Sequence, residues 1–259
     1  MGEPVYEIYA IRYAHRVGKR SDMFLDLVER PDEPLAMDYF VWLAVCPERT
    51  VVIDTGFTAE TALRMKRDYI ASPVDTLRRF GIDPGAVRDV ILTHLHYDHA
   101  GNVQSFPEAR YLVQNDELAY WTSPLAGRAS HNGDPSDYVY LVRAAYQHRV
   151  RGISGDADIM PGISVHLVRG HTPGMQVVRV NTARGIVVLA SDSSHYYENI
   201  EKDRPFRTLH TVPLVYAAFD RVRELAGPDG LILPGHDPLV TDRFPAASAE
   251  FRDLVYRIA

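Results

Sequence analysis

The segment VILTHLHYDHAGN, residues 90–102, places three of the chain's 11 histidines and one aspartate within six consecutive positions after an apolar run. A strand interior gains nothing from alternating imidazoles, and burying unpaired polar rings costs stability. At an extended strand end, the side chains of His94 and His96 project to the same side and can share one metal ion. Asp98 and His99 follow where the chain turns into a helix, so they approach from another direction, as a second ion requires. The segment therefore predicts a metal site with room for two ions.

Three further candidate ligands stand in turns that directly follow predicted strands. Loops held by a rigid sheet are where binding groups usually lie, and glycine beside a histidine lets the backbone approach closely. Closed structural metal sites prefer four ligands, often cysteines, whereas these candidates together leave open positions on two ions, which favours an enzyme over a metal-stabilised binding module. The three are His171 after the strand at 163–168, Asp192 after 185–191 and His236 after 231–233.

Isolated histidines and the single cysteine have plainer expected roles. Cys46 lies in the apolar segment DYFVWLAVC, where a buried, inert thiol is expected because a nucleophilic cysteine needs a polar, activating setting. Solvated or hydrogen-bonded histidines are commoner than ligands, so no chemistry is expected of the isolated ones. These are His15, His131, His148, His166 and His210.

Composition limits the class of protein. With 259 residues, 46% of them hydrophobic, the chain can bury a sizeable core, and we expect one domain over residues 1–259. A net charge of −6 and a pI near 6.0 argue against nucleic-acid binding, which needs clustered lysine and arginine. Gly-rich phosphate-binding fingerprints are absent from the sequence, so a nucleotide cofactor has no support.

The beginning of the sequence, MGEPVYEIYAIRYAH, lacks the basic region and the apolar region of a signal peptide. No run approaches the roughly 18 apolar residues of a membrane span. We therefore expect a cytoplasmic protein that acts on a small molecule and has no membrane partner. The sequence leaves the oligomeric state open, a homodimer included.

Hydrophobic periodicity and turn residues predict the secondary structure. A helical, aromatic-rich insertion is expected at about 115–150, interrupted by a loop rich in Gly and Pro. The order of strands and helices favours a layered α/β sandwich over a parallel doubly wound sheet. Strands are predicted at about 5–13, 38–46, 50–54, 89–94, 109–114, 162–168, 176–182, 185–191 and 230–235, and helices at 58–70, 73–80, from Asp98, at 212–226 and after Pro245.

These residues resemble one known family, the metallo-β-lactamase fold superfamily. Its H-x-H-x-D-H motif is matched by His94, His96, Asp98 and His99, and VVIDTG (51–56), HTPG (171–174), Asp192 and GHD (235–237) follow the family's order. The resemblance spans most of the chain. It implies an α/β (α+β) fold, the four-layer αββα sandwich of the metallo-β-lactamase type, with a dinuclear metal site at one edge.

The resemblance also implies how the ligands are divided. Two divalent ions are expected, with Zn²⁺ first and Fe or Mn as alternatives, because imidazole suits more than one of these metals. Asp54 in IDTG matches a position that braces the ligand loop from behind. The implied ligands are His94, His96 and His171 for the first metal, Asp98, His99 and His236 for the second, and Asp192 bridging both.

Within the superfamily, the overall spacing and the segment LAMDYFVWLAV (35–45) are most similar to the N-acyl homoserine lactonase group and related small-lactone hydrolases. We therefore expect a hydrolase that opens a lactone or similar ester with a hydroxide held between two ions. Antibiotic-hydrolysing relatives normally lack the aspartate that Asp192 supplies. A glyoxalase-II-like thioesterase carries a C-terminal helical region, but only 23 residues follow His236. This thioesterase and an iron-dependent oxidoreductase of the same fold remain the alternatives.

One position departs from the lactonase pattern. Lactonases of this group place a tyrosine three residues after the bridging aspartate, whereas this chain has His195 there, followed by Tyr196. We expect His195 or Tyr196 to donate a hydrogen bond to the substrate carbonyl and stabilise the oxyanion. Asp98 is the candidate to shuttle the proton. For the segment 23–25 and the aromatic residues Trp121, Tyr138 and Tyr140, core packing is the favoured role, and pocket walls are the alternative.

Overall fold

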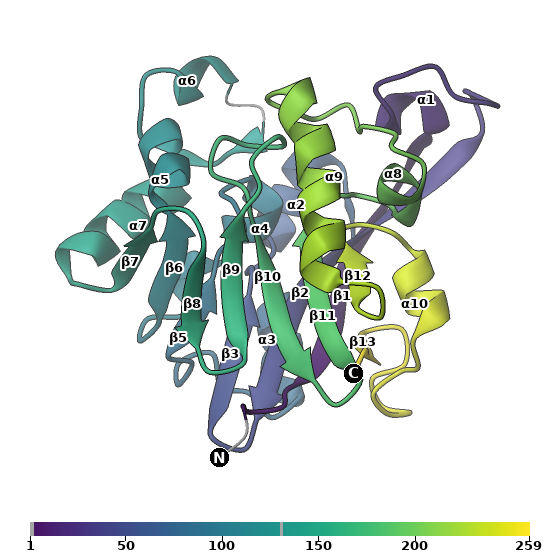
Figure 1. Ribbon diagram of the computed structural model, residues 1–259. Helices are drawn as coiled ribbons and strands as arrows, with labels where there is room; N and C mark the ends of the chain where they lie inside the picture. Colours follow the sequence, from purple (N-terminus) through teal and green to yellow (C-terminus); the bar gives the residue numbers. More distant parts are fainter. Residues whose placement is uncertain (1–2, 130–131) are drawn as a thin grey trace.

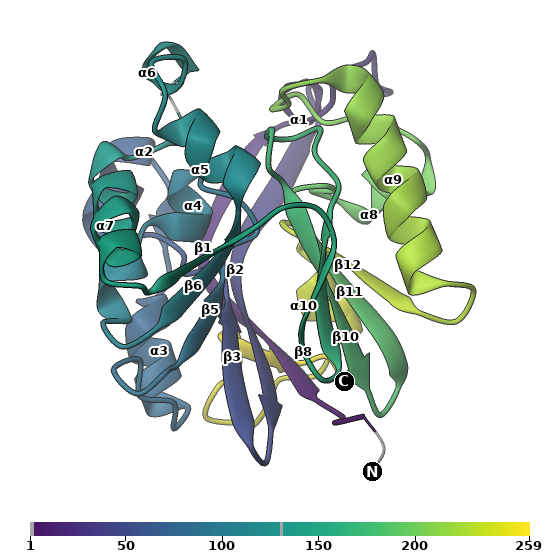
Figure 2. The ribbon, with the colours of Figure 1, turned by 60° about the vertical axis from the view of Figure 1, so that its left-hand side comes forward.

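The computed structural model describes residues 3–129 and 132–259, and it contains two β-sheets packed face to face. Helices cover the outer face of each sheet, as Figures 1 and 2 show, so the layers run helix, sheet, sheet, helix. The expected four-layer αββα sandwich is therefore confirmed. Both chain ends lie at the lower end of the molecule as drawn in Figure 1.

The larger sheet has eight strands in the part of the chain that the structure describes. Its order is β13-β1-β2-β3-β5-β6-β7, and β4 pairs with Ala14 and His15 in the second half of β1. Strands β3, β5, β6 and β7 run parallel, so their carboxyl ends meet at one edge. The bounds are β1 Glu7–Lys19, β2 Pro34–Cys46, β3 Arg49–Ile53, β4 Asp68–Tyr69, β5 Asp89–Ile91, β6 Arg110–Gln114, β7 Val150–Ile153 and β13 Val255–Arg257.

The smaller sheet has five strands in the order β12-β11-β10-β9-β8 across the described residues. The expected meander is confirmed by the antiparallel pairs of β9 with β10 and of β10 with β11. β12 runs parallel to β11, which brings the turn after β12 beside the turn after β11. The bounds are β8 Ala157–Met160, β9 Ile163–Leu167, β10 Gln176–Thr182, β11 Gly185–Ser191 and β12 Leu231–Pro234.

Side-chain alternation along the strands builds the layers. In β2, Phe40 and Trp42 face the other sheet, whereas Val41 and Leu43 face the helices on the outer side. In the smaller sheet, Val188 packs in a separate core with α9. The helices are α1 Arg20–Met23, α2 Ala59–Met65, α3 Pro73–Arg79, α4 Tyr97–Ala100, α5 Asn115–Trp121, α6 Ala126–Ala129, α7 Pro135–Tyr146, α8 Tyr197–Glu201, α9 Val212–Ala226 and α10 Leu239–Arg243, with a 3₁₀ turn at Val103–Ser105.

Several predicted elements differ from the structure. The helix expected after Pro245 is wrong: this segment contains no helix and ends in β13, whose Val255 and Tyr256 pair with β1. Strands β7 and β8, and helices α8 and α10, were not predicted because their short patterns are weak. The predicted strand at 89–94 ends at Ile91, so His94 and His96 lie in the following loop instead of on the strand.

No helix among the described residues is long and apolar enough to cross a membrane.

Candidate metal centre

The seven predicted ligands all lie just beyond the carboxyl ends of strands, and the fold brings them together. His94 and His96 follow β5, while Asp98 and His99 lie in the short helix α4. The other three follow β9, β11 and β12 of the second sheet. All seven side chains are buried, and they form two groups: His94, His96, His171 and Asp192 in one, and Asp98, His99, Asp192 and His236 in the other, with ligand atoms within 4.8 Å in each group.

The first group has three imidazole nitrogens pointing at one place. The Nδ1 atom of His96 lies 3.0 Å from Nε2 of His94 and 2.9 Å from Nε2 of His171. The Nδ1 atom of His171 lies 2.7 Å from the Thr208 carbonyl oxygen, which can only accept. That atom therefore carries the proton in the neutral ring, and Nε2 offers a lone pair. A neutral imidazole has only one N–H to share with such neighbours, whereas a cation can accept a lone pair from each of the three nitrogens.

The second group is oriented in the same way. His236 donates from Nδ1 to the Asp38 carbonyl oxygen at 2.8 Å, and His99 turns its Nδ1 to the Asp54 carboxylate at 2.8 Å. The Nε2 atoms of both rings therefore face inward, 3.6 Å and 3.7 Å from Oδ2 of Asp98. The inward nitrogen of His99 is buried and has no hydrogen-bond partner in the described residues.

Asp192 belongs to both groups. Its Oδ2 lies 3.2 Å from Nε2 of His171, and its Oδ1 lies 2.9 Å from Nε2 of His236 and 3.2 Å from Nε2 of His99. Burial alone would raise the pKa of Asp192, but the surrounding histidines hold it well below its usual range. One ionised carboxylate thus stands between two sets of nitrogens, which is the arrangement a bridging ligand needs.

The histidines of the two ligand groups also differ in their protonation. Burial lowers the pKa of His94 and His171 well below the ordinary value and that of His96 to about 4, so these rings are neutral at pH 7. Burial also opposes protonation of His99 and His236, but nearby carboxylates, Asp192 first, raise the pKa of both. The second group therefore already attracts positive charge, which a metal ion would supply in place of protons.

Asp54 fixes the ligand loop in the way the sequence suggested. It follows β3 with φ of 61°, a left-handed conformation that is uncommon outside glycine. Its Oδ1 accepts from the Thr93 backbone N–H at 2.8 Å, and its Oδ2 accepts from the Thr93 hydroxyl at 2.8 Å and contacts His99. Asp54 thereby connects the loop of His94 to the ring of His99.

Glycine allows the turn after β12 to reach Asp192. A Cβ atom on Gly235 would lie 2.7 Å from Oδ1 of Asp192 and 2.8 Å from the Ser191 carbonyl carbon. The Gly235 N–H also donates to the carbonyls of Ser191 and Ser194. The expected role of glycine beside His236, close backbone approach, is therefore met by a specific contact.

Sequence reasoning missed Glu117, a fully buried residue of α5. Its Oε1 accepts from the Leu95 N–H at 3.0 Å and the Trp121 indole N–H at 2.7 Å, and its Oε2 accepts from the Thr172 hydroxyl at 2.7 Å and the Gly174 N–H at 2.8 Å. Leu95 lies between His94 and His96, and Thr172 follows His171. Glu117 therefore joins the two loops of the first group. An acidic residue on an otherwise apolar helical face is the only sequence signal for it.

The two candidates for the carbonyl donor face different surroundings. His195 is buried, its Nε2 lies 3.1 Å from Oδ2 of Asp192, and its ring stacks on Phe206 with centroids 4.1 Å apart. Burial lowers the pKa of His195, so the ring is neutral at pH 7. Tyr196 instead packs beside Phe24, with ring centroids 6.0 Å apart. His195 thus contacts a candidate ligand directly, which makes it the better placed of the two donors.

A pocket of about 240 Å³ opens beside the first group. Trp121, for which core packing was favoured, lines it, and its ring packs against His96 with centroids 5.4 Å apart. Tyr138 is buried behind Trp121 and donates to the Leu95 carbonyl at 3.1 Å, so it supports the ligand loop instead of forming a wall. The remaining lining residues are Tyr120, Asn132, Thr172, Pro173, Thr208, Leu209 and His210, with His96 and His171 at the base.

Other predicted wall residues lie elsewhere. Met23 and Phe24 are buried and Leu25 is exposed, while Tyr140 is half-buried beside Arg149. Of the isolated histidines, His15 contacts Asp38 and His166 contacts Asp156. His148 lies in the loop after α7, away from both ligand groups. His210 unexpectedly lines the pocket, and His131 lies outside the described residues.

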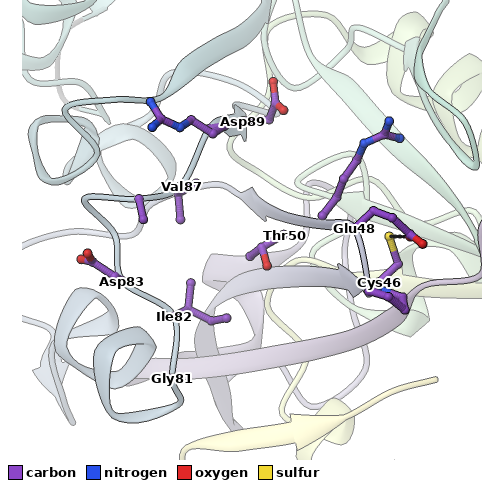
Figure 3. Close-up of a pocket in the computed structure, with 12 residues that line it drawn as sticks. Cys46, Glu48, Thr50, Gly81, Ile82, Asp83, Val87 and Asp89 are labelled. Carbon is purple, nitrogen blue, oxygen red and sulfur yellow. Dashed lines mark hydrogen bonds between the residues drawn. The ribbon is translucent and has the colours of Figure 1, made fainter.

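A larger pocket of about 550 Å³ lies at the opposite end of the parallel strands (Figure 3). Its lining comes from the end of β2 and the amino ends of β3 and β5, including Cys46, Glu48, Arg49 and Asp89. The Cys46 thiol is buried and contacts the Glu48 carboxylate at 3.4 Å. Because the candidate ligands follow the carboxyl ends of these strands, this pocket is separate from the metal centre.

The sequence profile of the Metallo-beta-lactamase superfamily matches residues 38–236, a range that includes every candidate ligand. The chain therefore belongs to the metallo-β-lactamase superfamily, as the sequence resemblance indicated.

Individual relatives point to one group of this superfamily. The chain is 29% identical over 224 residues to the N-acyl homoserine lactonase AiiA of Bacillus thuringiensis subsp. kurstaki, covering 80% of this chain and 84% of the relative. A solved N-acyl homoserine lactone hydrolase, with the product N-hexanoyl-L-homoserine bound at the catalytic metal center, superposes with a TM-score of 0.78 at 22% identity, covering 95% of this chain and 98% of that one. The dizinc quorum-quenching lactonase AidC gives 0.72 at 17% identity, covering 92% and 90%. At these identities the two structures establish the fold.

Proposed function

We propose that this chain hydrolyses a lactone ring with the help of two divalent metal ions, Zn²⁺ being the favoured metal. The observation that carries the proposal is the pair of ligand groups that share Asp192. Lactonase relatives and this histidine and aspartate cluster together fit a metal-dependent lactone hydrolase. A dizinc relative of the same fold supports zinc, and imidazole with carboxylate is a ligand set that zinc accepts.

The residues present fit two cations. In the first group, Nδ1 of His96 lies within about 3 Å of Nε2 of both His94 and His171. In the second, the inward nitrogen of His99 is buried and forms no hydrogen bond among the described residues, although Oδ1 of Asp192 lies 3.2 Å away. Cations would satisfy these nitrogens: His94, His96 and His171 would hold one ion, Asp98, His99 and His236 would hold the other, and Asp192 would be shared by both. When bound, the two ions supply Lewis acidity toward the lactone carbonyl and lower the pKa of a bound water.

The chain's own side chains complete the chemistry. In this proposal the Nε2–H of His195, which faces Asp192 at 3.1 Å, is shared with the carbonyl oxygen of the substrate, and this hydrogen bond strengthens as negative charge develops on that oxygen. Asp98 takes the proton released by the attacking water and delivers it to the alkoxide that leaves the opened ring. Trp121 and the other pocket residues exclude bulk water, which strengthens these electrostatic contacts.

A substrate panel tests the proposal. The kcat/KM values for N-hexanoyl-homoserine lactone, a glutathione thioester and a β-lactam should be highest for the lactone. An Asp192→Ala variant should be inactive toward all three, which excludes a contaminating hydrolase. If the thioester is preferred by about tenfold or more, the lactonase assignment is wrong, although a metal-dependent hydrolase would stand.

A further inference from the structure

Two arginines near the second ligand group have no acidic partner. Among the described residues, neither Arg16 of β1 nor Arg67, which follows α2, has a carboxylate oxygen within 4.0 Å. The guanidinium of Arg16 contacts only thioether sulfurs, with Nε 3.2 Å from Sδ of Met37 and Nη2 3.3 Å from Sδ of Met23. Sulfur is a weak acceptor, so the donors of Arg16 are poorly satisfied.

Arg67 is better held, and it too forms no ion pair with a carboxylate among the described residues, although Asp98 belongs to the charged groups around it. Its Nε donates to the Tyr97 hydroxyl at 3.2 Å and its Nη1 donates to the Met65 carbonyl at 2.6 Å, both of which are neutral groups. Both arginines are half-buried. A partly buried cation without a counter-charge costs stability, so two of them in one region need an explanation.

Arg16 and Arg67 both lie near the side chain of Tyr39. In the β1–β2 pairing, Ala14 lies opposite Tyr39 and Arg16 lies opposite Met37, so Arg16 is the diagonal neighbour of Tyr39 on the same face of the sheet. The Cζ atom of Arg67 lies 6.0 Å from the centre of the Tyr39 ring. Burial raises the pKa of the Tyr39 phenol, and the charges of both arginines oppose that rise, as cations near the hydroxyl must.

This region adjoins the metal centre. The Tyr39 ring lies 5.0 Å from the ring of His236, with the planes at 70°. Tyr196 contributes a further donor, because its hydroxyl is buried and has no hydrogen-bond partner in the described part of the chain. Arg16 contacts Met23, and the next residue, Phe24, packs beside the Tyr196 ring, so Arg16 and Tyr196 are near one another. These donors therefore gather in the region of His236, and no carboxylate among the described residues pairs with either arginine.

We propose that Arg16, Arg67 and the Tyr196 hydroxyl form a subsite for a carboxylate carried by the lactone substrate. This inference rests on the proposed function and specifies its substrate class: a lactone with an anionic substituent instead of a purely aliphatic one. A carboxylate accepts charge-assisted hydrogen bonds from guanidinium groups and supplies the missing counter-charge. An aliphatic chain would leave the same donors unpaired beside an apolar group.

A matched substrate series tests the subsite on the wild-type holoenzyme. Homoserine lactones acylated with malonic, succinic or glutaric acid carry a terminal carboxylate at three distances from the ring, and the corresponding terminal amides are neutral and of the same size. We expect kcat/KM for at least one acid to exceed that of its amide by about tenfold or more. The advantage should shrink as salt is added, because salt screens partly exposed charges.

Substitutions locate the effect. Arg16→Met and Arg67→Met should each reduce the acid-to-amide ratio severalfold, whereas Arg16→Lys, which keeps the charge, should retain part of it. Arg252→Met, at an exposed arginine before β13, is the matched control and should leave the ratio unchanged. Binding of the ring-opened succinyl product, measured by calorimetry, should weaken in Arg16→Met and not in Arg252→Met.

The outcomes separate the two proposals. If the wild-type enzyme opens acids and amides equally well at all three lengths, the subsite is overturned while the lactonase proposal stands. If the acid is preferred but the preference survives both arginine substitutions, the subsite is overturned as placed here. If no member of the series is opened, nor N-hexanoyl-homoserine lactone, the proposed function fails and the subsite fails with it.

Discussion

Individual side chains at the candidate site are held in one orientation by their neighbours. His195 is the example nearest to the proposed reaction, since Phe206 stacks on its ring and Asp192 lies 3.1 Å from its Nε2. Its neutral ring has one N–H, which faces Asp192 and is shared with the substrate carbonyl in the proposed reaction.

Removing that donor should slow the chemical step. His195→Ala is expected to lower kcat for lactone opening by about 10²-fold, the usual effect of losing one oxyanion donor. His195→Tyr should restore most of the lost rate, because it returns a hydroxyl donor to the same place. Steady-state kinetics beside a metal assay reads both effects. A kcat that stays within a few-fold of the parent in His195→Ala would leave the ring with a packing role alone.

Glu117 should act on the metals and not on the substrate directly. In Glu117→Gln, an amide nitrogen replaces one acceptor oxygen and faces N–H or O–H donors, so the loops of His96 and His171 lose a shared anchor. We expect metal affinity to fall by about 10- to 100-fold, as for other groups that orient ligands from behind. Competition with a chelator measures this directly, with the exposed Glu60→Gln as control. Equal affinity in both variants would contradict the positioning role.

At the scale of elements, the patterns predicted from sequence succeed where an apolar, β-branched run ends in a turn. The runs at 185–191 and 230–235 are examples, and the candidate ligands Asp192 and His236 stand at their ends. The failures are short elements whose pattern depends on a distant partner. The segment after Pro245 has helical spacing, but pairing of Val255 and Tyr256 with β1 outweighs that local preference. A single sequence does not show which distant strand such a segment pairs with.

Helix α7 contains a buried carboxyl group, Asp137, from which a separate stability prediction follows. Burial, followed by the nearby Asp134, raises the pKa of Asp137 to about 7. Between about pH 4 and pH 7 the folded chain therefore keeps a proton that the unfolded chain has released. The free energy of unfolding must fall as pH rises through this window, by up to about 1.4 kcal/mol per pH unit, and stay lower above it.

The substitution Asp137→Asn should remove this loss of folding stability with rising pH. At pH 7.5 the variant is expected to be more stable than the parent by on the order of 2–4 kcal/mol, and the difference should vanish near pH 4, where the parent carboxyl is neutral in both states. Denaturant unfolding across this pH range measures it, with the exposed Asp229→Asn as control. A difference that does not change with pH would show that Asp137 does not titrate as its burial implies.

At the scale of the whole molecule, the candidate metal centre forms because two sheets present their strand ends at one edge (Figure 2). The sequence allowed the ligands to be predicted, since each stands at a strand end in a recognisable motif. It did not allow the supporting contacts to be predicted. Glu117 joins segments more than 50 residues apart, and the arginines beside Tyr39 meet only through the register of β1 on β2 and the course of the chain after α2. Such contacts depend on tertiary packing that no local pattern encodes.

The central claim is that two metal ions held by the shared Asp192 make this protein a lactone hydrolase. Its most direct test is to remove all metal with a chelator, return zinc in steps, and follow ring opening of N-hexanoyl-homoserine lactone beside metal content by plasma emission. We predict that the metal-free protein is inactive, that activity returns fully at about two ions per chain, and that Asp192→Ala neither retains the metal nor recovers. Full turnover by protein shown to contain no metal would contradict the claim.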